Sequence, residues 1–96
     1  MKQEQHSLFI QGRLWHDKVN GNMYWSTRTE IDGQHVMTLG GLNYGYGSAF
    51  IFETLKVLGE RRLVPVTSAG ELRDLGWAVY TSASYGLKSE LFKGDA

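Results

Sequence analysis

Residues 23–39, MYWSTRTEIDGQHVMTL, decide the fold that we predict for this chain. Their first half is rich in β-branched and aromatic residues, which favours a strand. Asp32-Gly33 follows and is the strongest short hairpin signal, because a type I′ turn needs positive φ at both central residues. QHVMTL is then the return strand. Alternate residues of the first strand share a face: Tyr24, Ser26, Arg28 and Glu30 on one side, and Trp25, Thr27, Thr29 and Ile31 on the other.

A further strand is predicted on the N-terminal side, over residues 6–15, HSLFIQGRLW. Gly12 within it indicates a bulge or a close backbone approach. Asn20-Gly21 is the bend that leads into the next strand. Residues 6–39 are therefore expected to form a three-stranded antiparallel meander.

On the C-terminal side, residues 40–48, GGLNYGYGS, are expected to turn the chain sharply from the third strand into a helix. Ser48 is predicted to cap the helix that starts at Ala49 by accepting from a free backbone N–H. Gly59 is predicted to end this helix in the left-handed conformation. The apolar face that we expect to lie on the sheet consists of Ile51, Phe52, Leu55 and Leu58.

A short second helix and a closing strand complete the predicted order. Residues 60–66, ERRLVPV, are expected to be irregular because of Pro65. Ser68 and Glu71 form a capping box, and Gly76 ends the helix that they start. Residues 77–84, WAVYTSAS, are the last predicted strand. The predicted fold is thus a single α+β domain over residues 1–96 with one antiparallel sheet: an antiparallel meander of three strands, then two helices and a closing strand, with the helices on one face of the sheet.

Composition excludes several classes of protein. The chain has 96 residues, of which 42% are hydrophobic and 12% aromatic, which is too hydrophobic for a disordered protein. Ten basic and ten acidic residues give zero formal net charge, which disfavours a protein that depends on phosphate contacts. There is no cysteine, so disulfides and thiolate metal sites are excluded. We find neither a signal peptide nor a membrane span, and expect a cytoplasmic protein.

No motif for catalysis or cofactor binding is found. A phosphate-binding loop would need a Lys directly before Ser48, and a dinucleotide fingerprint would need Gly where Phe50 stands. The three histidines, His6, His16 and His35, do not have metal-ligand spacing. No serine lies in a nucleophile elbow. We therefore expect a protein without enzymatic activity, metal or cofactor.

The candidate contact residues come from the glycine-rich segment and the neighbouring strand. A sharp turn explains the glycines but not Tyr44 and Tyr46, whose rings either cover the edge of the core or are exposed to a partner. Arg28 is either a solvated or ion-paired strand residue or part of a contact surface. The predicted partner-binding set is Tyr24, Arg28, Asn43, Tyr44 and Tyr46.

These motifs together resemble those of small, mostly uncharacterised phage and prophage proteins. Such proteins combine an N-G-N-x-Y/F-x-S-x-R strand, a D-G turn and a Y-G-Y-G loop that opens a helix. The resemblance extends from about residue 8 to residue 92, and the chain departs from the pattern at Ser48-Ala49-Phe50, which is more apolar than usual. The matching residues are Asn20, Gly21, Asn22, Tyr24, Ser26, Arg28, Asp32, Gly33, Tyr44, Gly45, Tyr46 and Gly47.

The resemblance implies an accessory protein of the bacterial host cytoplasm that is not part of the virion. Some such proteins bind and disable host machinery, as anti-CRISPR proteins do. The expected partner is a host protein or protein complex, with no membrane contact. Two alternatives stay open: a nucleic-acid-binding regulator that uses the sheet face and the lysine-bearing C-terminal segment, and a self-associating protein that forms a homodimer through aromatic residues and an edge strand.

Overall fold

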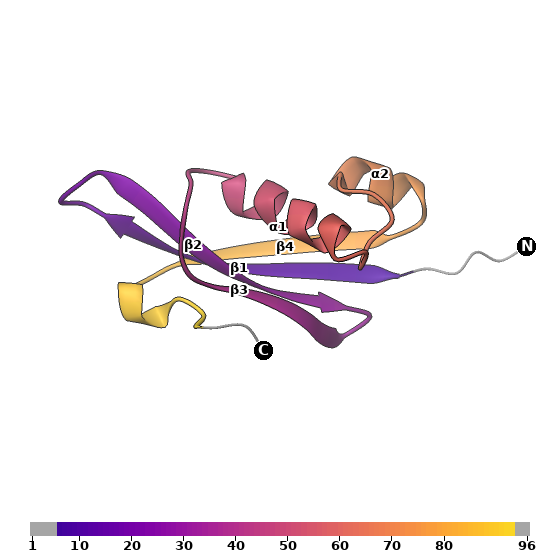
Figure 1. Cartoon of the computed structure of the whole chain (residues 1–96), viewed down its shortest axis with the longest axis horizontal. Helices are drawn as coiled ribbons and strands as arrows, with labels where there is room; N and C mark the ends of the chain where they lie inside the picture. Colours follow the sequence, from indigo (N-terminus) through magenta and orange to yellow (C-terminus); the bar gives the residue numbers. More distant parts are fainter. Residues whose placement is uncertain (1–5, 94–96) are drawn as a thin grey trace, which may run out of the picture.

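The protein is an α+β domain with a mixed four-stranded sheet and two helices (Figure 1). The computed structural model describes residues 6–93. The strands follow the order β3-β2-β1-β4 across the sheet. The elements are β1 (Ser7–Asp17), β2 (Asn22–Ile31), β3 (Gln34–Tyr44), α1 (Ala49–Glu60), α2 (Ala69–Asp74), β4 (Ala78–Tyr85) and the 3-10 helix η1 (Lys88–Glu90).

Strands β1, β2 and β3 form the predicted antiparallel meander. The β2–β3 turn has φ of 53° at Asp32 and 82° at Gly33, as the type I′ prediction requires. Gly21 in the β1–β2 turn also has positive φ, at 72°. Trp25, Thr27 and Thr29, which share a predicted face of β2, are all buried, and Ser26 of the other face is buried as well. The hairpins predicted from the sequence are therefore confirmed.

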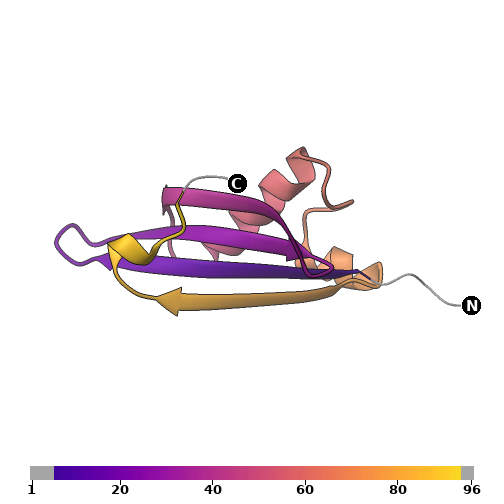
Figure 2. The same ribbon diagram turned by 90° about the horizontal axis from the view of Figure 1, so that it is seen from below.

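The prediction of an all-antiparallel sheet is wrong, because β4 pairs in parallel with β1 (Figures 1 and 2). Ser7 pairs with Ala78, and Leu14 with Tyr85. The reason lies in the direction of the strands. In a meander of three strands, both outer strands run the same way, and β4 also runs that way after the helical segment. A strand of this direction that joins an outer edge can only make a parallel pair.

Both helices lie on the same side of the sheet, and the core is between them and the strands (Figure 1). Gly12 occupies the middle of β1, where the register with β2 is regular. An added Cβ there would be 2.6 Å from the Phe50 ring and 3.2 Å from the Ser82 carbonyl oxygen of β4. Gly12 is thus the close approach that we predicted, not a bulge. The buried apolar residues are Leu8, Ile10, Leu14, Trp25, Met37, Phe50, Leu55, Leu58, Val64, Leu72, Val79 and Leu91.

Three predictions about α1 are wrong. Ser48 occupies the N-cap but makes no side-chain cap bond, because its φ of −85° and ψ of 9° are not the extended values of a capping residue. By contrast Ser68, which has φ of −122° and ψ of 131°, accepts from the Glu71 N–H as predicted. Gly59 lies inside the helix, and the left-handed residue after it is Arg62, with φ of 60°.

The predicted apolar face of α1 is also rotated from the observed one. Phe52 is 67% exposed, whereas Phe50 and Thr54 are buried with Leu55 and Leu58. The Thr54 hydroxyl lies 2.9 Å from that of Thr27 on β2. This buried polar pair interrupts the apolar periodicity, which made the neighbouring stripe appear to be the buried one.

After β4 the chain crosses to the opposite side of the sheet, where η1 lies away from the helices (Figures 1 and 2). Arg13 of β1 holds this segment: its guanidinium lies 4.1 Å from the centre of the Phe92 ring and donates to the Glu90 carbonyl. Phe92 in turn donates its N–H to Ser26 Oγ and accepts from the Gly41 N–H. The segment therefore buries Ser26 and binds the edge strand β3.

Candidate binding surface

Four aromatic side chains form a continuous row, which we call the aromatic ladder: Trp15, Tyr24, Tyr44 and Tyr46. Trp15 of β1 pairs with Tyr24 of β2, which pairs with Tyr44 of β3. Their flanking neighbours Leu14 and Trp25 are buried in the core, so these three side chains point away from the helices. Trp15 and Tyr24 are stacked with ring centroids 5.6 Å apart, and Tyr24 and Tyr44 meet edge to face at 5.8 Å.

Tyr46 completes the ladder and connects it to the β1–β2 turn. Its ring meets that of Tyr44 edge to face at 5.5 Å. Its hydroxyl donates to the Gly21 carbonyl at 2.7 Å and accepts from the Tyr44 hydroxyl at 3.3 Å. The hydrogen bond with Tyr44 is the main cause that raises the pKa of Tyr46, and partial desolvation adds to it. These bonds hold the rings in place before any partner binds.

The rings of the ladder contact one another but remain accessible. Tyr44 is 59% exposed and Tyr46 50% exposed, while Trp15 and Tyr24 are half-buried. Lys88 of η1 lies 5.6 Å from the centre of the Trp15 ring and adds a positive charge at this end of the row. An aromatic surface with polar hydroxyls and a charge at one end has the character of a protein-binding hot spot.

Sequence reasoning found three members of the ladder and missed Trp15 and Lys88. The structure brings Tyr24 of the predicted strand face together with Tyr44 and Tyr46 of the glycine-rich segment, a proximity that the sequence did not predict. Trp15 was identifiable from the hairpin, because the pairing of Asp17 with Asn22 around the turn places Trp15 opposite Tyr24. Lys88 reaches the ladder only through the path of the C-terminal segment, for which the sequence carries no local signal.

Asn43, another predicted contact residue, has a structural position instead. Its side-chain amide donates to the backbone carbonyls of Trp25 at 3.0 Å, Gly40 at 3.3 Å and Leu39 at 3.4 Å. These bonds close a bulge in β3, where the register shifts between the partners of Trp25 and Thr27. The bulge carries the chain through Gly40 and Gly41, so the first half of the predicted turn is strand and only residues 45–48 turn into α1.

Arg28, the fifth predicted contact residue, lies on the same face but is separate from the ladder. It pairs with Thr38 of β3, further along β2 towards the β2–β3 turn. One of its terminal nitrogens lies 3.9 Å from a carboxylate oxygen of Glu30 on its own strand. This long, half-exposed ion pair adds little stability. The structure therefore does not bring Arg28 together with the tyrosines.

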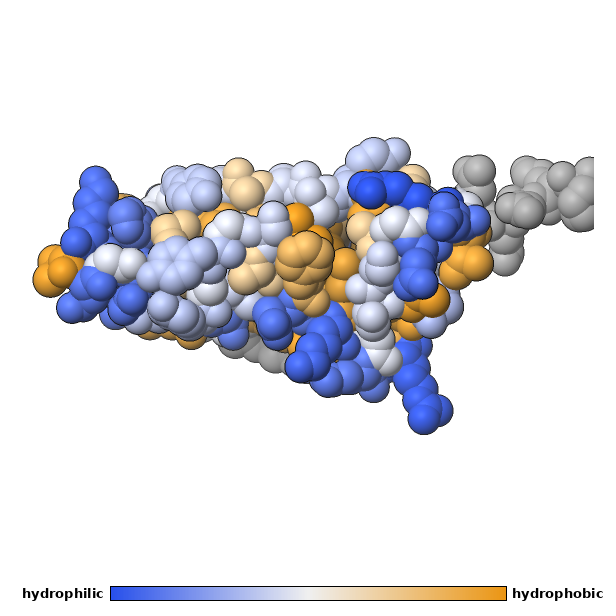
Figure 3. Space-filling view, turned by 90° about the horizontal axis from the view of Figure 1, so that it is seen from above, coloured by the Kyte–Doolittle hydropathy of each residue, from blue (hydrophilic) through white to orange (hydrophobic). Residues whose placement is uncertain are grey.

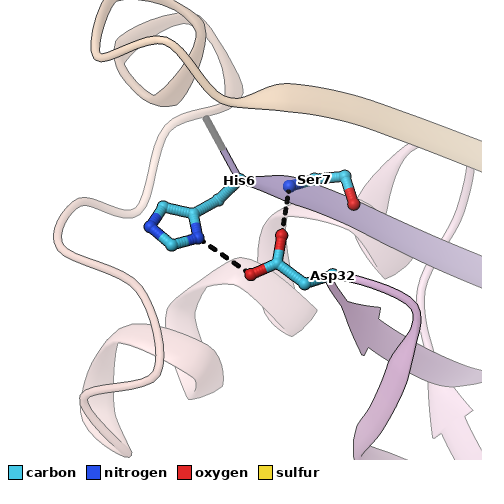
Figure 4. Close-up of polar contacts among 3 residues, drawn as sticks. All are labelled: His6, Ser7 and Asp32. Carbon is cyan, nitrogen blue, oxygen red and sulfur yellow. Dashed lines mark hydrogen bonds and ion pairs between the residues drawn. The ribbon is translucent and has the colours of Figure 1, made fainter. Parts of the chain in front are cut away.

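A second polar cluster joins the start of β1 to the β2–β3 turn (Figure 4). Asp32 accepts from the Ser7 N–H through Oδ1 at 2.9 Å and from His6 Nδ1 through Oδ2 at 2.8 Å. The hydrogen bond from His6 is the first cause that lowers the pKa of Asp32, and the bond from Ser7 adds to it. His6 also stacks at a tilt on Trp77, 4.8 Å away. The cluster fastens the strand to the turn.

The other candidates for chemistry lie apart. His16 and Asp17 are beside the β1–β2 turn, where Asp17 accepts from Asn20, while His35 lies beside the opposite turn and bonds to Thr38. Within residues 6–93, no three side chains of His, Cys, Asp or Glu form a group that could hold a metal ion. Over the same range, none of the helices has the length and apolar character needed to cross a membrane.

On the helix side of residues 6–93, we find no comparable row of aromatic rings in mutual contact. Seen from that side, apolar areas are scattered among hydrophilic ones (Figure 3). The exposed Phe52 belongs to this side, on α1. Comparison with protein-family models, with curated proteins and with solved structures found no match to this chain.

Proposed function

We propose that this is a small, non-enzymatic accessory protein of phage type that binds a host protein in the bacterial cytoplasm and blocks it, in the manner of an anti-defence inhibitor. The observation that carries this proposal is the aromatic ladder. Its four rings are held by each other and by the hydrogen bond from Tyr46 to Gly21, so a partner need not pay to order them. Interfaces between proteins are enriched in such aromatic residues.

The geometry of the rings favours a protein partner over a nucleic acid. Proteins that bind single-stranded nucleic acids stack the bases on the open faces of their aromatic rings. In the ladder, Trp15 stacks on Tyr24 and has Lys88 over its ring, and Tyr24 meets Tyr44 edge to face. The rings therefore engage one another, which leaves fewer open ring faces for bases, and the exposed Tyr44 and Tyr46 also offer hydroxyl groups to a partner. These suit hydrogen bonds and side-chain packing.

A pair of variants tests this proposal. We expect Tyr44→Ala combined with Tyr46→Ala to lose a partner that the wild-type protein retains in stoichiometric amounts from bacterial lysate. The matched control is Phe52→Ala, which removes another exposed ring from a different side of the molecule and should leave capture unchanged. Capture that is equal for all three proteins, or no stoichiometric partner for the wild type, would contradict the proposal.

The same variants distinguish the alternatives. The double variant should keep a cooperative thermal transition, because both rings are at least half exposed. Loss of folding would show that the rings are part of the core. Binding to single-stranded DNA or RNA that weakens steeply with salt, and is lost in the double variant, would favour the nucleic-acid regulator instead.

A further inference from the structure

Strand β4 lies at the edge of the sheet, and its outer side is the basis of an inference beyond the proposed function. Ala78 donates its N–H to the His6 carbonyl, and Gly86 donates to the Leu14 carbonyl. In a strand, alternate residues direct their backbone groups to opposite sides. The even-numbered residues of β4 therefore bond to β1, and Thr81, Ala83 and Tyr85 direct both N–H and C=O away from the sheet.

These outward groups are available to another strand. Within residues 6–93, β4 pairs with β1 alone. Every residue from Tyr80 to Tyr85 is exposed. Val79, the first outward residue, already accepts a hydrogen bond from Arg73 through its carbonyl oxygen, at 3.2 Å. The free stretch of the edge thus begins at Thr81 and ends at Tyr85.

The side chains of β4 include none of the features that block edge pairing. Natural proteins protect an edge strand with charges, proline or a bulge. The strand AVYTSASY has no charged residue and no proline, and its register with β1 is regular throughout. The outer edge is therefore a straight and neutral template.

We propose that a second copy of this chain pairs with β4 in antiparallel orientation and extends the two sheets into one. Centring the two-fold axis on Ala83 uses all three free residues, with Ala83 opposite its own copy and Thr81 opposite Tyr85. Each hydrogen-bonded pair supplies two bonds, so the ladder contains about six. A centre on Thr81 instead would require the Val79 carbonyl that Arg73 occupies.

A second copy suits this edge better than a foreign strand for two reasons. The register places aromatic Tyr85 opposite β-branched Thr81 twice, which is a stabilising cross-strand combination. No like charges meet along the strand, and the formal net charge of the chain is zero, so two copies do not repel each other at long range. The contact area of one strand pair is small, which predicts a reversible dimer that forms as concentration rises.

Hydrogen exchange at two protein concentrations tests the pairing directly. The amides of Ser82 and Ser84 bond to β1 and should exchange slowly at every concentration. The amides of Thr81, Ala83 and Tyr85 should exchange fast in dilute solution and at least about tenfold more slowly when the dimer forms, since opening then requires dissociation. Fast exchange of all three outward amides at millimolar concentration, with a monomer mass by sedimentation, would overturn the proposal.

Cysteine substitution tests the register, because the natural chain has no cysteine. Ala83→Cys should form a symmetric disulfide dimer on oxidation, since a hydrogen-bonded pair separates Cα atoms by about 5.5 Å. Thr81→Cys is the matched control and should oxidise more slowly, because it faces Tyr85 of the other copy. Preferential cross-linking of Thr81→Cys would overturn the Ala83-centred register.

A charge at the centre of the interface supplies the disruptive variant. Ala83→Lys places two ammonium groups opposite each other and should raise the dimer dissociation constant at least about tenfold. Ser89→Lys adds the same charge on exposed η1 and should leave the dissociation constant unchanged. Equal dissociation constants for the two variants would overturn the assignment of the interface to β4.

Discussion

The two edges of the sheet differ in how they are protected. At the β3 edge, a bulge closed by the Asn43 amide interrupts the strand, and the Phe92 carbonyl accepts from the Gly41 N–H. At the β4 edge, the strand is regular and uncharged from Ala78 to Tyr85. Edge protection in natural proteins limits unwanted pairing. The contrast teaches that only one edge is suited to accept another strand, and that the chain uses its C-terminal segment to cover the other.

Proline substitutions at two neighbouring positions of β4 compare the edge that bonds to β1 with the outer edge. We expect the largest loss of stability when the edge that bonds to β1 is disrupted. Ser82→Pro removes an N–H that bonds to β1 and should lower the free energy of unfolding by about 3 kcal/mol. Ala83→Pro removes an outward N–H and should cost much less, because proline is tolerated on the open side of an edge strand. Urea denaturation measures both. Equal losses would contradict the assignment of outward residues.

A side chain at Gly12 would clash with the Phe50 ring and crowd the backbone of β4. Gly12→Ala should lower the free energy of unfolding by about 2 kcal/mol, since its methyl group would overlap the Phe50 ring in a packed core. Gly70→Ala in α2 is the control: its methyl group would lie 3.7 Å from the Ser68 hydroxyl, an ordinary van der Waals contact, so the change should be neutral or slightly stabilising. Thermal or urea unfolding of both variants provides the comparison.

Removing the Asn43 amide would weaken the bulge that interrupts the β3 edge and would make this edge more like the regular β4 edge. Asn43→Ala removes the donor that closes the β3 bulge and should cost about 1 to 2 kcal/mol, since backbone carbonyls lose a partner. Amide exchange should accelerate around Gly41 before it changes in β1. Asn22→Ala removes only two long contacts, each of 3.4 Å, to the hydroxyls of Tyr24 and Tyr46, and should have a smaller effect. An equal effect would contradict a specific role for the Asn43 amide.

Acid should weaken the β2–β3 turn, with the smallest expected effect because Asp32 is exposed. Its pKa is lowered from 3.8 in the folded protein, chiefly by the hydrogen bond from His6. A lowered pKa contributes stability that is present above 3.8 and is lost as the pH falls through the folded-state value. Asp32→Asn keeps a residue that tolerates positive φ and should flatten this part of the pH profile of the melting temperature. An unchanged profile would exclude Asp32 as the titrating group.

Signals from residues close in sequence predicted the helices and strands of this fold. They could not predict how strands that are distant in sequence pair. The turn at Asp32-Gly33 and the N-cap bond of Ser68 both depend on neighbours in sequence, and both are confirmed. The parallel position of β4 depends on which free edge it joins after the helices. Alternation within the strand is the same for either edge, so the sequence pattern could not distinguish them.

The same limit applies to the candidate site. Tyr44 and Tyr46 stood out because a sharp turn explains the glycines around them but not the two rings, whereas Tyr24 was included from a predicted strand face. Asn43 was included as part of the glycine-rich segment and Arg28 as part of the strand face of Tyr24, yet the bulge directs the Asn43 amide to backbone carbonyls of β2 and β3. Trp15 required the cross-strand register, which depends on where the β1–β2 turn closes.

The parallel pairing of β1 with β4 also determines the order in which the sheet can be completed. Each hairpin of the meander forms between segments that are neighbours in sequence. The β1–β4 pairing instead joins residues far apart in sequence, such as Ser7 with Ala78 and Leu14 with Tyr85. Long loops must close before such distant contacts form, which slows folding relative to proteins rich in local contacts. We therefore expect the two hairpins of the meander to form before β4 pairs with β1, so that the sheet is completed only when the C-terminal strand is available.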